Sequence, residues 1–318
     1  SAGAWSQSSH LPTLAAHPDV ELVALSSPNA ETAQKLAAAF AVPLAFTDWR
    51  DVLADKPDIV VVSSPPVAHE EQVIAALEAG AHVLVEKPFA LEGSAARRMR
   101  DTAERVGRVL LVGFGWPAAP CFALSKQLID AGEIGAIEHL TMHLAVNTRA
   151  LLMGGTDGGW GGDGSSAAST YTDRRISGGG SAAVSMSHQL GLIEWLAGEP
   201  IVALHASTYP PGREIDLHAT VHAEFAGGGS AAISSASTHP YLARPQWHMA
   251  LYGSKGQIWL DSVADHVRLV RANGDVVEYG PVEASGVYDS GAPTKALIAC
   301  AQGAPAPTGL TAELAAHV

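Results

Sequence analysis

The tripeptide Glu86-Lys87-Pro88 combines residue types that could do chemistry, and it directly follows a short apolar run that we expect to be a strand. Lys87 would then lie at the carboxyl edge of a sheet, with Pro88 restricting the backbone after it. A lysine at such an edge can hydrogen-bond the hydroxyl of a bound substrate and steer a proton. The alternative is a surface lysine paired with Glu86, which the tripeptide taken alone would favour.

A second candidate is His188, which stands at the start of an apolar helix expected over 187–197. Imidazole titrates near neutral pH, so this residue could donate or accept a proton during a reaction. Taken alone, however, a histidine at a helix start is more often a cap or a packed polar side chain. The two interpretations stay open at this level.

The opening residues have the frame of the G-x-G-x-x-G turn, with serine at the first and third glycine positions, and lead into a helix that ends near Ala16. Backbone N–H groups at such a turn can hold a pyrophosphate. A plain strand–helix turn is the simpler interpretation, because the motif is weak on its own. The candidate contacts to a dinucleotide are Gly3, Ala4, Trp5 and Ser6.

The next strand ends at Ser26 and Ser27, close to the separation of about 20 residues at which such proteins read the ribose. An acidic residue there would select NAD by binding the 2′-hydroxyl. Ser27 carries no charge to repel a 2′-phosphate, but no arginine follows it, so NADP is only slightly preferred over NAD. Further candidates at the same sheet edge follow the third strand: Ser64, Pro65, Pro66 and His69.

The elements that would position these residues alternate between strand and helix in the first third of the chain. Such repetition predicts a doubly wound parallel sheet of Rossmann type. We expect strands at 20–25, 58–62, 81–85 and 109–112, and helices at 30–40, 48–54, 69–79 and 91–106.

After Gly115 the pattern changes to longer strands, which predicts an α+β domain with a large open, mostly antiparallel sheet. The predicted domains are 1–115, which would bind NAD(P), and 116–318, for substrate binding and oligomerisation. We also expect a first strand before the opening turn and a longer last helix than 311–318, so both ends look cut. The expected strands are 136–147, 201–208, 217–225, 230–237, 248–253 and 257–260, with helices at 120–131, 187–197 and 292–301.

Composition excludes several classes of protein. The 318 residues include 19 Lys+Arg and 32 Asp+Glu, a formal net charge of −13, which argues against nucleic acid and anionic membranes as partners. Hydrophobic residues make up 47%, enough for a sizeable core. Two cysteines exclude a disulfide scaffold and a cysteine-based zinc site and suit the cytoplasm. We expect no metal.

The long segment between Met153 and Gly180 is rich in glycine and serine but also carries aromatic and arginine residues, which favours a functional loop. Aromatic faces suit the C–H surfaces of sugars, and arginine can clamp a carboxylate or phosphate. Packing and solvated charge are the alternative interpretations. The candidate substrate contacts are Trp116, Tyr171, Arg174 and Arg175, with Trp160 and His239 considered beside them.

Several motifs together resemble the Gfo/Idh/MocA family, the glucose–fructose oxidoreductase and inositol dehydrogenase group. They are Ser64-Pro65-Pro66-x-x-His69, Glu86-Lys87-Pro88, 112–116, Gly178-Gly-Gly180 with His188, and 251–256. The resemblance implies a Rossmann domain followed by an α/β domain, NAD or NADP as cofactor, and a sugar, cyclitol or related polyol as substrate. It also implies a homo-dimer or homo-tetramer that associates through the C-terminal sheet.

By the same resemblance, Lys87 is the catalytic lysine, His188 the general acid/base, and Gly3 the middle glycine of the nucleotide turn. The chain departs from the family pattern at Val184 and Gly191, where many members carry aspartates, and at Gly115, usually asparagine. These departures leave the substrate and the direction of the reaction open. The main alternative is a non-catalytic nucleotide-binding regulator or scaffold of the same fold; a second is a metal-dependent hydrolase or lyase on another scaffold.

Overall fold

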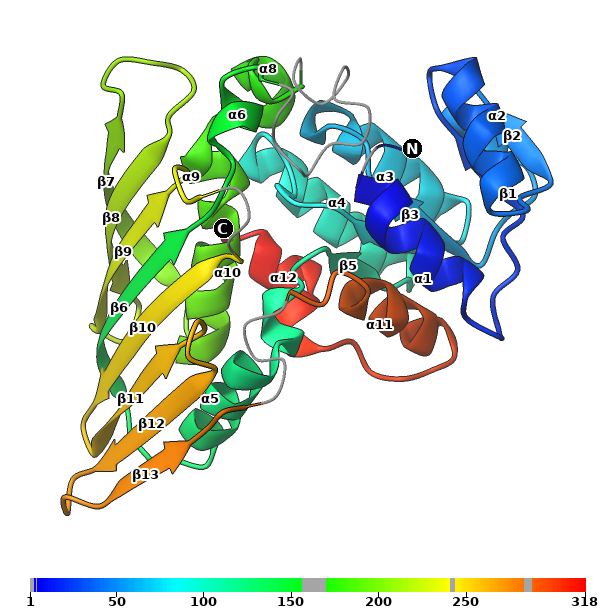
Figure 1. Cartoon of the computed structure of the whole chain (residues 1–318). Coiled ribbons are helices and arrows are strands. Elements are labelled where there is room, and N and C mark those ends of the chain that lie inside the picture. The colour runs from blue at the N-terminus through cyan, green and yellow to red at the C-terminus, as the bar shows by residue number, and fades with distance from the viewer. Residues whose placement is uncertain (1–2, 4, 156–169, 241–243, 283–287) are drawn as a thin grey trace.

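The computed structural model describes residue 3 and residues 5–155, 170–240, 244–282 and 288–318. One part is a parallel α/β arrangement, and the other is a large twisted sheet with helices along one of its faces (Figure 1). No described helix is long and apolar enough to cross a membrane.

The first part confirms the predicted alternation of strands and helices. A short π-helix over Ser6–His10 continues into α1 (Leu11–Ala15), and the 48–54 helix is a 3-10 helix over Trp49–Leu53. The remaining elements are β1 (Ala24–Ser26), α2 (Ala30–Ala39), β2 (Leu44–Phe46), β3 (Ile59–Val62), α3 (His69–Glu78), β4 (His82–Val85), α4 (Gly93–Val106) and β5 (Leu110–Val112).

All strand pairs in this part are parallel, as predicted, but they form two pieces instead of one continuous sheet. β3, β4 and β5 make a three-stranded sheet, while β1 pairs only with β2. No strand of the described residues bridges β1 and β3. The β4 side chains Val83, Leu84 and Val85 are fully buried, as expected for a strand covered on both faces.

The second part contains an eight-stranded sheet in the order β13-β12-β11-β10-β6-β9-β8-β7, antiparallel except between β6 and β9. Burial alternates along β8, so one face of the sheet packs on the core. The strands are β6 (Ile137–Ala145), β7 (Ile201–Tyr209), β8 (His218–Phe225), β9 (Ser230–Ala236), β10 (Gln246–Gly253), β11 (Gly256–Asp261), β12 (His266–Arg271) and β13 (Val276–Tyr279). The helices are α5 (Pro120–Asp130), α6 (Arg149–Leu152), α8 (Arg174–Ser177), α9 (Ser181–Val184) and α10 (Met186–Ala197).

The sequence analysis missed three strands. β2 is only three residues long, and β12 and β13 carry charged residues among their apolar ones, so none contains an apolar run long enough to signal a strand.

The end of the chain returns to the first part. Leu297 of α11 (Ala292–Ala301) is buried in one cluster with Leu84 and Leu111 of the parallel sheet. α12 (Ala312–Ala315), shorter than the helix expected over 311–318, packs against α4. The last residues therefore complete the core of the first part, although the predicted boundary near Gly115 assigns them to the second.

Candidate active site

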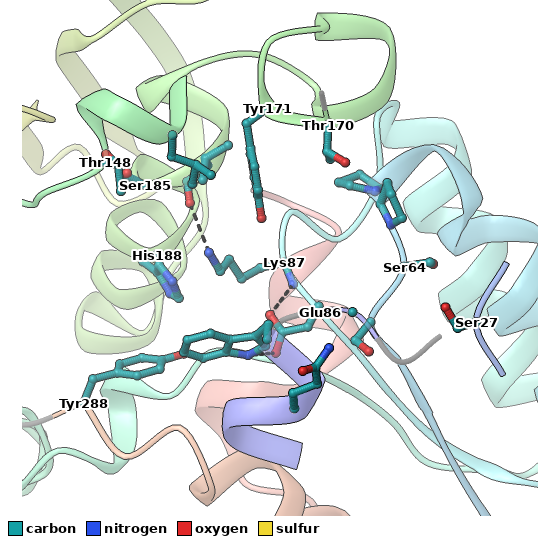
Figure 2. Close-up of a pocket in the computed structure, with 18 of the residues that line it drawn as sticks. Ser27, Ser64, Glu86, Lys87, Thr148, Thr170, Tyr171, Ser185, His188 and Tyr288 are labelled. Atoms are coloured by element: carbon teal, nitrogen blue, oxygen red, sulfur yellow. Dashed lines mark hydrogen bonds between the residues drawn. The ribbon is translucent and has the colours of Figure 1, made fainter. Parts of the chain in front are cut away.

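A cleft of about 560 Å³ lies at the carboxyl ends of the parallel strands and extends toward α9 and α10 of the second part. Ser27 and Ser64 lie toward one end, and Lys87 and His188 face each other further along (Figure 2). Tyr171 closes the side opposite Glu86. Both parts of the chain thus contribute side chains to one cavity.

Lys87 reaches into this cleft from the end of β4. Its Nζ donates a hydrogen bond of 3.4 Å to the backbone carbonyl of Val184, so a residue of α9 fixes the end of the side chain. Burial lowers the pKa of Lys87, while the negative charge of Glu86 opposes that shift. The structure places Lys87 at the sheet edge, and the carboxylate of Glu86 turns away from its ammonium group.

Glu86 instead accepts hydrogen bonds from groups beneath the cleft. Its Oε1 accepts from the indole Nε1 of Trp5 at 2.9 Å and lies 3.0 Å from His10 Nε2, and its Oε2 accepts from the backbone N–H of Lys87 at 3.2 Å. Because a carboxylate only accepts, His10 Nε2 carries the proton, and His10 Nδ1 can accept from the hydroxyl of Thr294, 2.8 Å away. Burial would raise the pKa of Glu86, but the hydrogen bond from His10 and the positive charge of Lys87 hold that pKa below its usual value.

Gly113 leaves the space that this carboxylate occupies. A Cβ atom at position 113 would lie 2.6 Å from Glu86 Oε1, closer than any real contact. The position of the Glu86 carboxylate, directly after β4, therefore depends on a glycine at position 113, directly after β5.

His188 lies on the first turn of α10, with its ring directed into the cleft near Lys87 (Figure 2). Its Nδ1 is buried and has no hydrogen-bond partner among the described residues. Burial, and secondly the positive charge of Lys87, lowers the pKa of His188 well below its usual value. This shift favours the neutral imidazole, the form that can accept a proton.

The predicted cofactor contacts divide into three groups. Those that line the cleft are Gly3, Trp5, Ser27, Ser64, Pro65, Pro66, Glu86 and Lys87. Ser6 and Ser26 are buried outside the lining, and Ala4 lies outside the described residues.

His69 also lies outside the lining. It is completely buried, with Nε2 2.8 Å from the carbonyl oxygen of Ser64 and Nδ1 3.1 Å from that of Phe89. Its side chain thus links the loops after β3 and β4 instead of facing a ligand.

The predicted substrate contacts are also only partly brought together. Trp116 and Tyr171 line the cleft, and burial raises the pKa of Tyr171 to about 12, so its hydroxyl is protonated. Arg174 and Arg175 lie outside the lining because the short helix α8 turns them to solvent, where Arg175 forms an ion pair with Asp173. Trp160 falls outside the described residues.

Other lining residues gave no signal in the sequence. Tyr288 lies more than 170 residues beyond the strand it contacts, and its hydroxyl donates to the carbonyl of Gly113 and accepts from the N–H of Gly115, both at 3.2 Å. No local sequence pattern predicts this contact, because the fold brings together residues that are far apart in the sequence. The further lining residues that we did not predict include Thr32, Lys35, Thr148, Ser185 and Pro245.

The two parts of the chain match two family models. Residues 2–114 match the oxidoreductase family with an NAD-binding Rossmann fold, and residues 122–259 match the GFO/IDH/MocA C-terminal domain. The fold and cleft thus define a two-part, NAD-binding oxidoreductase architecture. The chain belongs to the Gfo/Idh/MocA family.

Its relatives include sugar dehydrogenases. The chain is 32% identical over 195 residues to levoglucosan dehydrogenase of Pseudarthrobacter phenanthrenivorans, covering 60% of this chain and 46% of the relative. It is 34% identical over 185 residues to D-glucoside 3-dehydrogenase of Escherichia coli, covering 58% and 48%. The chain spans about half the length of these curated relatives.

Solved structures share the fold over nearly the whole chain. A levoglucosan dehydrogenase in complex with NADH and levoglucosan superposes with a TM-score of 0.76 at 21% identity, covering 98% of this chain and 90% of that one. An oxidoreductase domain protein from Kribbella flavida gives 0.75 at 23% identity, covering 98% and 88%.

Proposed function

We propose that this protein is an NAD(P)-dependent oxidoreductase that transfers a hydride between nicotinamide and a hydroxyl- or carbonyl-bearing carbon of a sugar, cyclitol or related polyol. One observation carries the proposal. Lys87 from the first part and His188 from the second face the same cleft, which Gly3 and Trp5 of the predicted nucleotide turn also line. The names of the sugar dehydrogenases among the relatives support this substrate class.

The described residues fit a dinucleotide. The cleft extends from the end of β1 across the end of β3 to the end of β4, which is the crevice where parallel sheets bind nucleotides. Gly3 presents bare backbone there: even a Cβ atom at this position would have no closer neighbour than Ser63 O, at 3.7 Å. Trp5 would lie against the cofactor near Lys87, and Ser27 would lie beside the ribose at the far end.

A bound nicotinamide dinucleotide supplies the hydride acceptor or donor. Lys87 would donate a hydrogen bond to the reacting oxygen and orient it. When an alcohol is oxidised, its C–H hydrogen leaves as hydride, the neutral imidazole of His188 takes the hydroxyl proton, and a C=O bond forms. In the reverse direction, a protonated His188 or Lys87 returns the proton to oxygen.

Within this function we propose a slight preference for NADP over NAD. Ser27 at the end of β1 carries no charge that would repel a 2′-phosphate, and Lys35 of α2 lines the same end of the cleft. Glu31 lines this end as well, and its negative charge would repel the 2′-phosphate, which limits the preference for NADP. We expect Ser27→Asp to weaken NADPH binding more than tenfold while NADH binding changes little; equal effects on both cofactors would contradict this assignment.

The function is tested by following NADH and NADPH at 340 nm with a panel of neutral sugars, cyclitols and their keto forms. We expect turnover that falls at least a hundredfold in Lys87→Met and in His188→Gln, with cofactor binding retained. Tight cofactor binding without turnover on any substrate would instead indicate the regulator or scaffold. Turnover unaffected by both substitutions would disprove the assigned roles.

We further propose that a second copy of the chain covers the outer face of the eight-stranded sheet. Helices lie along the other face (Figure 1), while the outer face exposes Trp259, 48% accessible, beside Tyr252. Light scattering should give a dimer or tetramer, and Trp259→Glu should shift it toward monomer. Both cysteines are free and buried, which fits the reducing cytoplasm proposed as its location.

A further inference from the structure

We propose that Tyr288 is a positioning residue that, together with Phe114, holds the His188 imidazole in its place in the cleft by ring packing. In this arrangement Gly115 leaves space for the Tyr288 ring, and Gly191 leaves space for the Phe114 ring. The inference rests on the proposed function, because it explains how the proposed proton acceptor is oriented.

Two aromatic rings contact His188 edge-on. The ring centroid of Phe114 lies 6.0 Å from that of His188 with an interplanar angle of 64°, and that of Tyr288 lies 5.8 Å away at 73°. Such edge-to-face geometry is favourable for aromatic pairs. The two rings come from distant parts of the chain: Phe114 lies two residues after β5, and Tyr288 lies shortly before α11.

Glycines stand where each of these rings packs on backbone. A Cβ atom at Gly115 would lie 2.6 Å from Cζ of Tyr288, and one at Gly191 would lie 3.2 Å from the ring of Phe114. A side chain at position 115 therefore could not coexist with Tyr288 in its present place, and one at position 191 would press on Phe114. Two of the three departures from the family pattern thus coincide with the positions of the two rings.

The Tyr288 ring is itself fixed at both ends. Its hydroxyl bridges the backbone of Gly113 and Gly115, and its ring packs on Trp116 with centroids 4.9 Å apart. The fixed Tyr288 ring can therefore restrict the orientation of the His188 imidazole that packs against it.

Ring packing takes this role because no described polar group holds the second nitrogen of the His188 ring. A proton-transferring histidine is commonly oriented by an acceptor on its second ring nitrogen, but Nδ1 of His188 has no partner among the described residues. The described charged group that acts on His188 is Lys87, which disfavours the imidazolium form. Burial among these rings and the charge of Lys87 together favour the neutral imidazole, the form that can accept a proton.

Tyr288→Leu and Tyr288→Phe test the proposal. Leucine removes the ring, so we expect kcat to fall about tenfold or more while the Kd for NADH changes less than threefold. Phenylalanine keeps the ring and loses only its tether to the backbone, so a smaller fall in kcat, about two- to fivefold, is expected. If the leucine variant does not fold, the proposal is judged by whether kcat of the phenylalanine variant falls by the expected two- to fivefold.

The second readout is NMR titration of the His188 imidazole in the protein without substrate, with His188→Gln identifying its signal. We expect a midpoint below 6.5 in the parent protein, and an upward shift when Tyr288 is shortened and water enters. This measurement needs no turnover, so it separates failure of the inference from failure of the proposed function.

A double substitution tests the coupling between positions 115 and 288. Gly115→Ala should displace the Tyr288 ring and lower kcat, but should have little further effect in the Tyr288→Leu background. Additive effects of the two substitutions would overturn the proposal. So would a His188 titration and a kcat that remain unchanged in every Tyr288 variant.

Discussion

Replacing Glu86 by glutamine would test whether the carboxylate beneath the cleft organises the site. The substitution keeps the shape and removes the charge. Glu86 accepts from Trp5, His10 and the backbone N–H of Lys87, using both of its oxygens. Glutamine has one carbonyl oxygen, so its amide NH₂ must face at least one of these donors.

A buried donor left without an acceptor costs about 1–3 kcal/mol. For a chain of this size, that corresponds to a Tm lower by roughly 1–5 °C. The loss of the negative charge also shifts the pKa of Lys87 in a definite direction. Because Glu86 opposes the effect of burial, its removal should lower the pKa of Lys87 further, and the alkaline limb of the kcat/KM profile should move to lower pH.

Differential scanning fluorimetry and the pH profile of kcat/KM measure both effects. Glu92→Gln is the matched control, because Glu92 is exposed and its side chain makes no capping hydrogen bond. An unchanged Tm together with an unchanged alkaline limb in Glu86→Gln would refute the reasoning that this carboxylate holds the site together.

Three further predictions follow from the same geometry. Gly113→Ala should lower stability by about 1–3 kcal/mol in chemical denaturation, because its Cβ would press on Glu86; a stability equal to the parent would show that the carboxylate moves freely. Because the pKa of His188 is lowered, kcat/KM for oxidation should stay level down to pH 6.5 and fall only below it, whereas a midpoint at 6.5 or above would contradict the assigned burial. Arg175→Ala should leave kcat/KM within twofold, since this side chain is 90% exposed and lies outside the cleft lining; a tenfold loss would restore it as a substrate contact.

The parallel strands and their helices could be predicted because their signals are local. The β-branched run before Val62 and the apolar run before Glu86 each fit a buried strand, and parallel order then places their ends at one edge. Lys87 could be placed at that edge for the same reason. By contrast, the separation of β1 and β2 from the other strands depends on long-range pairing, which no local pattern contains.

The contents of the cleft were harder to predict because side-chain direction depends on packing. Arg175 has the right chemistry for a substrate clamp, but α8 directs it to solvent, where Asp173 pairs with it. His69 has the right chemistry for a ligand contact, but it is buried between two carbonyl groups. Residue type indicates what a side chain could do, whereas burial and hydrogen-bond partners decide which possibility the fold uses.

The segment before and at the start of α11 explains why the site cannot be derived from the first two hundred residues alone. Thr294 bonds to His10, which in turn bonds to Glu86 next to Lys87. Tyr288, six residues earlier, contacts the His188 ring. One stretch near the end of the chain therefore supports both candidate catalytic groups, through hydrogen bonds on one side and ring packing on the other. A change in the position of α11 would disturb Lys87 and His188 together, so their relative placement depends on the packing of α11 against the parallel sheet.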